Sequence, residues 1–93
     1  MLSILIPTYN YNVYPLAYQL EQQACASNII FEIICFDDGS TSKLNLENEK
    51  INTLKNSKFI ALKKNIGLSN NRNKLAESAE GVKKTNDLLA VNA

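Results

Sequence analysis

Two adjacent carboxylates, Asp37 and Asp38, are the side chains best placed to do chemistry, because they end an apolar run and are followed by a glycine and two hydroxyl residues. The run before them, residues 31–36, is rich in β-branched and aromatic side chains and stops sharply at a turn, which is typical of a buried strand. In open parallel sheets ligands bind at the carboxyl ends of strands. The pair therefore marks either a ligand site or a turn in which Asp side chains bind nearby backbone N–H groups, and both interpretations stay open here.

Length and composition limit what the chain could be. Its 93 residues, 45% of them hydrophobic, suffice for one small domain. Ten basic against nine acidic residues leave a net charge of +1, which creates no field suited to nucleic acid or to an acidic membrane surface. Two cysteines and no histidine supply no zinc-ligand set. We expect both cysteines to act as small apolar residues in a reducing compartment.

Targeting and membrane signals are also missing from the sequence. The apolar start, residues 1–6, is too short for a signal peptide and lacks its charged flank. No apolar run approaches the roughly 20 residues of a membrane span. We expect a cytoplasmic protein without a transmembrane segment, or, within a longer parent, one held peripherally at the inner face of the membrane.

The hydrophobic pattern predicts three strand–helix units in succession. The strands are expected at residues 2–6, 31–36 and 58–62, and each is followed by a helix. The first helix is expected at 13–27 and the third at about 69–80, while the second should be capped within residues 40–42 and turn Leu44, Ile51 and Leu54 inward. This order predicts right-handed crossovers and a parallel sheet covered by helices on both faces. The third helix should carry Arg72, the one arginine, on or beside its buried face. The apolar segment 88–91 has no place in such a three-stranded core.

Three polar features converge if the first two strands are neighbours: the tip of strand one at residues 7–10, the acidic pair, and the helix that carries Arg72. A carboxylate can accept from the N–H edge of a base, an extended tip can offer backbone N–H and C=O groups to the same ring, and arginine can bind phosphate. Neither the dinucleotide motif nor the P-loop motif is present. The pattern predicts nucleoside recognition, with Arg72 as a purely structural partner of an acidic side chain as the alternative.

Three sequence blocks carry a resemblance to a known family. Ser-Ile-Leu-Ile-Pro-Thr-Tyr-Asn at 3–10, Glu-Ile-Ile-Cys-Phe-Asp-Asp-Gly-Ser-Thr at 32–41, and Asn-Ile-Gly-Leu-Ser-Asn-Asn-Arg-Asn at 65–73 resemble the N-terminal half of a family 2 glycosyltransferase of the GT-A fold. The resemblance extends over residues 1–81. It implies an α/β fold, namely a Rossmann-like three-layer sandwich with a short, mainly parallel sheet.

The resemblance also implies a function and a set of binding residues. Such enzymes transfer a sugar from a nucleotide sugar, commonly a UDP-sugar, to a saccharide or lipid-linked acceptor, and full-length members use Mg²⁺ or Mn²⁺. In this sequence Asp38 would meet the base, Asp37 would support the turn, and Arg72 would lie near the base or the diphosphate. The substrate-binding residues implied in this way are Pro7, Thr8, Tyr9, Asn10, Asp37, Asp38 and Arg72.

The last residues depart from the family pattern. There the family continues with a strand that ends in an Asp-x-Asp metal motif and later supplies a catalytic base, whereas here Asp87 precedes the short apolar run and is not assigned to a metal. We therefore expect one partial nucleotide-binding domain over residues 1–93, truncated and inactive by itself, with no metal site and no catalytic residue. The alternative is a noncatalytic remnant that acts as an assembly module.

Two further expectations concern assembly and competing classes. A homo-oligomer is expected, with residues 88–91 pairing with a partner's sheet edge or packing on a partner helix. A phosphorylatable receiver domain fits less well, because its acidic cluster draws on three strands and its lysine on a fifth.

Overall fold

The structure is a computed structural model that describes residues 1–79 and 88–90. Four strands form one sheet in the order β3-β2-β1-β4, and each neighbouring pair is parallel. The strands are β1 (Leu2–Thr8), β2 (Phe31–Asp37), β3 (Ser57–Ala61) and β4 (Leu88–Ala90). The helices are α1 (Tyr14–Ala26), α2 (Asn45–Asn48), the 3-10 helix η1 (Glu49–Thr53) and α3 (Leu68–Ser78).

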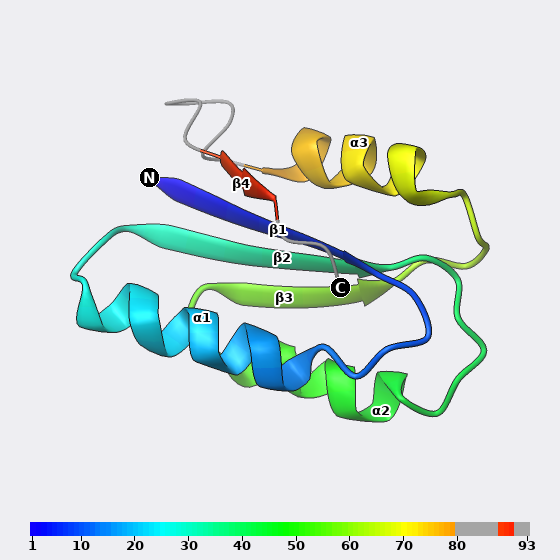
Figure 1. Cartoon of the computed structure of the whole chain (residues 1–93), viewed down its shortest axis with the longest axis horizontal. Coiled ribbons are helices and arrows are strands. Elements are labelled where there is room, and N and C mark those ends of the chain that lie inside the picture. The colour runs from blue at the N-terminus through cyan, green and yellow to red at the C-terminus, as the bar shows by residue number, and fades with distance from the viewer. Residues whose placement is uncertain (80–87, 91–93) are drawn as a thin grey trace.

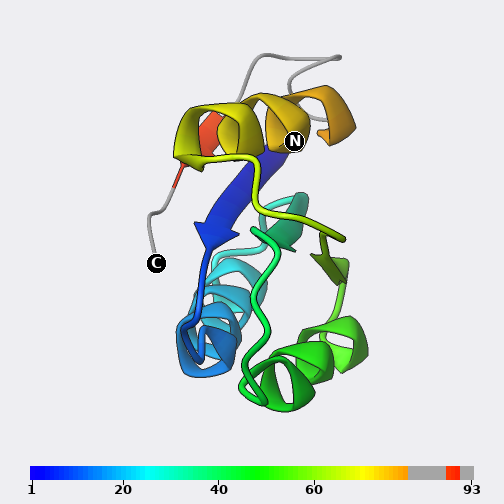
Figure 2. The ribbon, with the colours of Figure 1, turned by 90° about the vertical axis from the view of Figure 1, so that its right-hand side faces the viewer.

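Helices cover both faces of the sheet, as the order of the elements predicts. Figure 1 shows α1 and α2 along one side of the strands and α3 along the other, and Figure 2 shows the same three layers from the end. The predicted α/β class and the parallel sheet are thereby confirmed. Strands one and two are neighbours, which meets the condition under which the polar features were expected to converge.

The two central strands are buried on both faces, which explains why their sequences are continuously apolar. Because successive strand residues point to opposite faces, Ile33 and Cys35 pack under α1 and η1, whereas Ile34 and Phe36 pack under α3. The larger core cluster lies on the α1 side, and the smaller one is completed by Leu75 of α3 with its neighbours. Both clusters end where β2 reaches its acidic pair.

The second crossover differs from the sequence prediction. Instead of one helix that turns Leu44, Ile51 and Leu54 inward, the chain forms the four-residue α2 and then η1. Ile51 is fully buried, but Leu44 is exposed. The physical reason lies in Asn48, whose buried side chain binds backbone groups of another segment, so that a polar contact and not an apolar stripe orients this connection.

The segment near the C-terminus also differs from expectation. Leu88–Ala90 pairs with Ser3–Leu5 as a fourth strand of the chain's own sheet. The sequence predicted pairing with a partner's sheet edge, whereas the segment pairs with the open edge of its own sheet beside β1. Residue 91 and Asp87 lie outside the described residues. Homo-oligomerisation stays a prediction.

Within residues 1–79 and 88–90, no helix has the length and the apolar character that a bilayer crossing needs.

The two thiols should differ sharply in reactivity. Cys25 is exposed on α1, whereas Cys35 is buried in β2. Burial, with the charge of Asp37 as a second cause, raises the pKa of the Cys35 thiol well above its ordinary value, so this sulfur stays a protonated, unreactive thiol. We expect Ellman's reagent to titrate one thiol in the native protein and the second only after unfolding in guanidinium chloride.

The control for this measurement is Cys25→Ser, which should abolish the native reaction and leave the second thiol to appear on unfolding. Rapid reaction of both thiols in the native chain would contradict the burial of Cys35.

Candidate functional site

A pocket of about 250 Å³ opens at the carboxyl ends of β1 and β2, beside the start of α3. It is bounded by the tip of β1, the residue after β2, and the loop and first turn of α3. Its lining residues are Pro7, Thr8, Tyr9, Asp38, Asn65, Gly67, Leu68 and Asn71. The structure thus brings four of the seven sequence-predicted residues to one cavity, at the edge of the sheet where open parallel folds bind ligands.

Asp38 joins three segments at this pocket. Its backbone N–H donates to the carbonyl of Thr8 at 2.8 Å, and its carboxylate accepts from the backbone N–H groups of Ile66 at 2.6 Å and Gly67 at 3.0 Å. The carboxylate is buried and faces the N-terminal end of α3, where the helix dipole favours a negative charge. Each oxygen keeps a second lone pair, so Asp38 holds the loop and can still accept from a ligand.

Asp37 has a different environment, outside the pocket. This fully buried carboxylate accepts from the backbone N–H of Ser40 at 2.8 Å, from the Ser40 hydroxyl, and from Nδ2 of Asn45 at 3.1 Å. Gly39 N–H also donates to the Asp37 carbonyl at 2.9 Å. The sequence left two interpretations of the acidic pair open. Asp37 binds groups of the turn, as the first interpretation has it, and Asp38 lines the pocket, as the second has it.

Asn71 lines the pocket and was missed by the sequence analysis. It is buried on the inner face of α3, and its Nδ2 donates to the carbonyl of Phe36 at 3.0 Å, which fixes the orientation of the amide. Its Oδ1 and the hydroxyl of Thr8 are buried without a hydrogen-bond partner among residues 1–79 and 88–90. Buried polar atoms without a partner are rare, and these two leave hydrogen-bonding positions unfilled. The sequence signal that could have placed Asn71 on the inner face of α3 is its spacing of four residues from the apolar Leu75.

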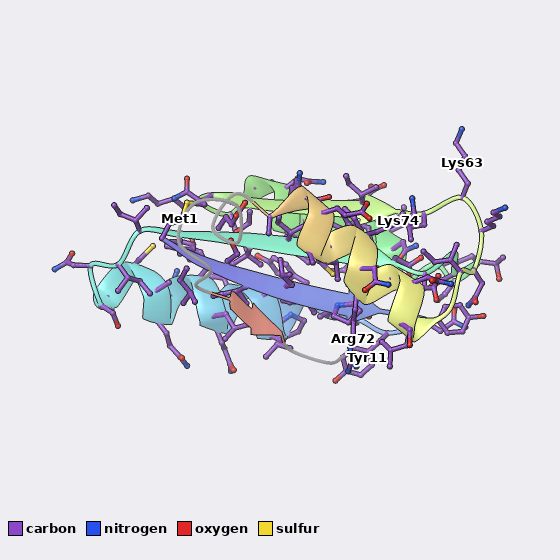
Figure 3. The ribbon with its side chains drawn as sticks, turned by 90° about the horizontal axis from the view of Figure 1, so that it is seen from above. Met1, Tyr11, Lys63, Arg72 and Lys74 are labelled. Atoms are coloured by element: carbon purple, nitrogen blue, oxygen red, sulfur yellow. The ribbon has the colours of Figure 1, made fainter. Side chains whose placement is uncertain are left out.

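Arg72 lies beside the buried face of α3 and not on it, the second of the two positions that the sequence allowed. Its side chain is exposed and does not line the pocket, while the neighbouring Asn71 and Leu75 point inward. The bond from Asn71 to β2 sets the rotation of the helix and turns the next residue outward. Figure 3 shows Arg72 leaving α3 on the side of β1, whereas Lys74 leaves on the opposite side and Lys63 extends from the loop after β3.

Asn10 also lies beside the pocket rather than in it. Its backbone N–H donates to the Ser40 hydroxyl oxygen at 2.9 Å, and its φ of 50° places it in the left-handed region, which asparagine tolerates better than most residues. It therefore connects the tip of β1 to the turn after β2.

The fold and the position of the pocket define a class of protein. A parallel sheet with helices on both faces, and with a polar pocket at the carboxyl ends of two neighbouring strands, is the arrangement of Rossmann-like nucleotide-binding folds. The chain belongs to glycosyl transferase family 2, whose family model matches residues 3–82.

One solved structure extends this comparison. The chain is similar to TarS of S. aureus in its crystal structure, with a TM-score of 0.69 and 29% sequence identity over 98% of this chain. It spans 16% of that TarS chain. Among curated proteins no significant match was found. The family resemblance and the GT-A, Rossmann-like fold expected from the sequence are thus confirmed.

The carboxylates of the described residues do not fit the divalent metal that this family implies. Both oxygens of Asp37 and both of Asp38 already accept from N–H or O–H donors, and residues 1–79 and 88–90 contain no group of three potential metal ligands. A metal ion on the remaining lone pairs of Asp38 would lack the two further carboxylate, thiolate or imidazole ligands of a three-ligand set among these residues.

The two glycines at this edge should respond differently to substitution. A Cβ on Gly39 would overlap the backbone of Lys64 and Asn65, and its φ of 73° is unfavourable for L-residues. Gly67, at φ 88° and ψ 156°, has open space around it, so Gly67→Ala suffers only backbone strain of about 1–3 kcal/mol. We expect Gly39→Ala to lower the free energy of unfolding by more than Gly67→Ala, measured by urea denaturation. Equal losses of unfolding free energy in the two variants would contradict the close contact between Gly39 and the backbone of Lys64 and Asn65.

Proposed function

We propose that this chain binds the nucleoside end of a nucleotide sugar, in the first place a UDP-sugar, as the donor-binding part of a glycosyltransferase that acts on a saccharide or lipid-linked acceptor. The observation that carries the proposal is the carboxylate of Asp38 in the wall of the pocket at the strand tips. The family membership gives the class of reaction.

The size of the pocket fits part of such a ligand. Pockets that enclose a whole drug-sized molecule measure roughly 300–1,000 Å³. The cavity of about 250 Å³ suits a base with some of its ribose, while a diphosphate and sugar would extend beyond it.

The charge of the pocket favours a base over a phosphate. Asp38 already occupies the N-terminal end of α3, the position where a phosphate would otherwise bind, and its negative charge repels another anion. A neutral ring with an N–H donor suits this carboxylate. We place the diphosphate outside the pocket, on the side of α3 that carries the exposed cation Arg72.

The tip of β1 supplies the remaining polar groups. The N–H of Leu2 donates to the carbonyl of Ile30, and the carbonyl of Thr8 accepts from the N–H of Asp38. The even-numbered residues of β1 therefore turn their backbone N–H and C=O groups toward β2. The C=O of Pro7 and the N–H of Tyr9 therefore face away from β2, and both residues line the pocket. In our proposal the N3–H of uracil donates to Asp38 and a ring carbonyl accepts from Tyr9 N–H.

Nucleotide titration tests this proposal. We expect UDP to bind with a Kd on the order of 0.1–1 mM, because a few hydrogen bonds must offset the ordering cost of association. Asp38→Asn should weaken UDP binding about tenfold or more, since it removes a charged acceptor. CDP, whose N3 can accept from an amide, should lose less. The exposed Glu49→Gln is the control with the same charge change.

The measurement is the movement of NMR resonances on titration. Shifts should appear at residues 7–10, 38 and 65–71. A titration in which none of these resonances moves would overturn the proposal, and an unchanged UDP affinity in Asp38→Asn would remove Asp38 from it.

We also propose that the 93-residue chain does not transfer sugar by itself. A diphosphate leaving group needs a cation or an equivalent positive site, and the sequence contains no Asp-x-Asp motif to hold one. We expect no release of UDP from UDP-sugars in the presence of Mg²⁺ or Mn²⁺, and nearly unchanged thermal stability when either ion is added. Metal-dependent UDP release by the purified chain would disprove this.

A further inference from the structure

Asn65 is a pocket residue outside the seven that the sequence predicted. It lies in the loop between β3 and α3 and lines the pocket together with Asp38. The backbone N–H of Gly67 is shared by two acceptors, Oδ2 of Asp38 at 3.0 Å and Oδ1 of Asn65 at 3.2 Å. Because both oxygens bind the same hydrogen, the amide of Asn65 and the carboxylate of Asp38 are neighbours.

The shared bond also decides which end of the Asn65 amide is available. A backbone N–H can be bound only by the amide oxygen, so Oδ1 faces Gly67 and Nδ2 is left for other partners. Within the described residues Nδ2 of Asn65 has no hydrogen-bond partner. The residue is exposed, so this donor binds water until a ligand replaces it.

The backbone of Asn65 is held as closely as its side chain. A Cβ on Gly39 would lie 2.4 Å from the backbone nitrogen of Asn65, so the turn directly after Asp38 packs tightly against this loop. Asp38 and Asn65 are thus joined twice, through the N–H of Gly67 and through Gly39. The carboxylate acceptor and the amide donor therefore keep their relative position without a ligand.

The order of the strands places Asp38 between two donors. Since β2 lies between β1 and β3, Tyr9 at the tip of β1 is on one side of Asp38 and the loop with Asn65 is on the other. The peptide unit that joins Thr8 to Tyr9 is held to Asp38 by the bond from Asp38 N–H to Thr8 C=O at 2.8 Å. Across the strand tips the order is therefore donor, acceptor, donor.

We propose that Asn65 is a specificity-determining residue, whose Nδ2 donates to the O4 carbonyl of uracil and so selects uracil over cytosine. The inference rests on the proposed function, in which Asp38 accepts from N3–H. Uracil carries a carbonyl on each side of N3–H, so its edge presents acceptor, donor and acceptor. Cytosine has an amino group in place of O4 and an unprotonated N3, and would set donor against donor and acceptor against acceptor.

The direction of the diphosphate decides which carbonyl meets Asn65. The ribose is bonded to N1, next to the C2 carbonyl, and the proposed diphosphate position is on the side of Arg72, which Figure 3 shows on the side of β1. O2 then faces Tyr9 on β1, and O4 faces Asn65 on the opposite side. O4 is the carbonyl that cytosine lacks, so Asn65 is the donor that distinguishes the two bases.

Two substitutions of Asn65 and one control test the proposal by NMR titration of the full chain with UDP and with CDP. Asn65→Asp keeps an oxygen for the N–H of Gly67 but replaces the donor by an acceptor, which suits the amino group of cytosine. Asn65→Ala removes both groups. Asn73→Asp is the matched control, because it makes the same charge change at an exposed residue of α3 that does not line the pocket.

The readout is the ratio of the two dissociation constants, because partial unfolding raises both constants by the same factor and cancels from the ratio. We expect the preference for UDP over CDP to fall about tenfold in Asn65→Asp, which loses one hydrogen bond to uracil and offers one to cytosine, and about threefold in Asn65→Ala. It should be unchanged in Asn73→Asp. In the unsubstituted chain the side-chain NH₂ resonances of Asn65, and not those of Asn73, should shift when UDP is added.

The outcomes separate this inference from the proposed function. If the unsubstituted chain binds neither nucleotide, the proposed function fails and this inference with it. If it prefers UDP and Asn65→Asp keeps that preference, Asn65 only binds the N–H of Gly67, and the inference is overturned while the proposed function stands. Equal affinities of the unsubstituted chain for UDP and CDP, or an equal rise of both constants in Asn65→Ala, would also overturn it.

Discussion

The placement of two ionised side chains at the end of one buried strand is the constraint on which this structure depends. A buried charge without partners is strongly unfavourable, so the acids at the end of β2 must find donors from other segments. Asp37 takes them from the turn and from α2, and Asp38 takes them from the two residues before α3. The need to satisfy these carboxylates orders the whole carboxyl edge of the sheet.

The polar network on the α2 side follows from the same rule. Irregular backbone that passes over a core cannot satisfy its own N–H and C=O groups, and side chains must do so. Asn48 and Ser40 do this for the loop after β1, which explains why a short helix that contains a buried asparagine lies in the second crossover. This short helix therefore holds the loop after β1 in place.

Family membership and site geometry contribute different parts of the functional argument. The match to glycosyl transferase family 2 and the similarity to TarS define the class of protein and the fold. A fold by itself hosts many functions, so the ligand must be argued from the pocket. There the carboxylate at the start of α3 favours a neutral N–H donor over a phosphate, which agrees with the nucleoside end of a nucleotide sugar.

The sequence by itself determined the alternation of strands and helices along the chain, the parallel sheet, the edge at which the pocket lies and the position of the acidic pair at that edge. These follow from local signals, namely apolar runs, helical spacing and a sharp turn after β2. Only the tertiary structure decided which acid faces the pocket, that Asn71 and not Arg72 turns inward, and that residues 88–90 join the sheet. Periodicity leaves the rotation of a short helix uncertain by a residue, and partners far along the chain, such as the Phe36 carbonyl for Asn71, select one rotation.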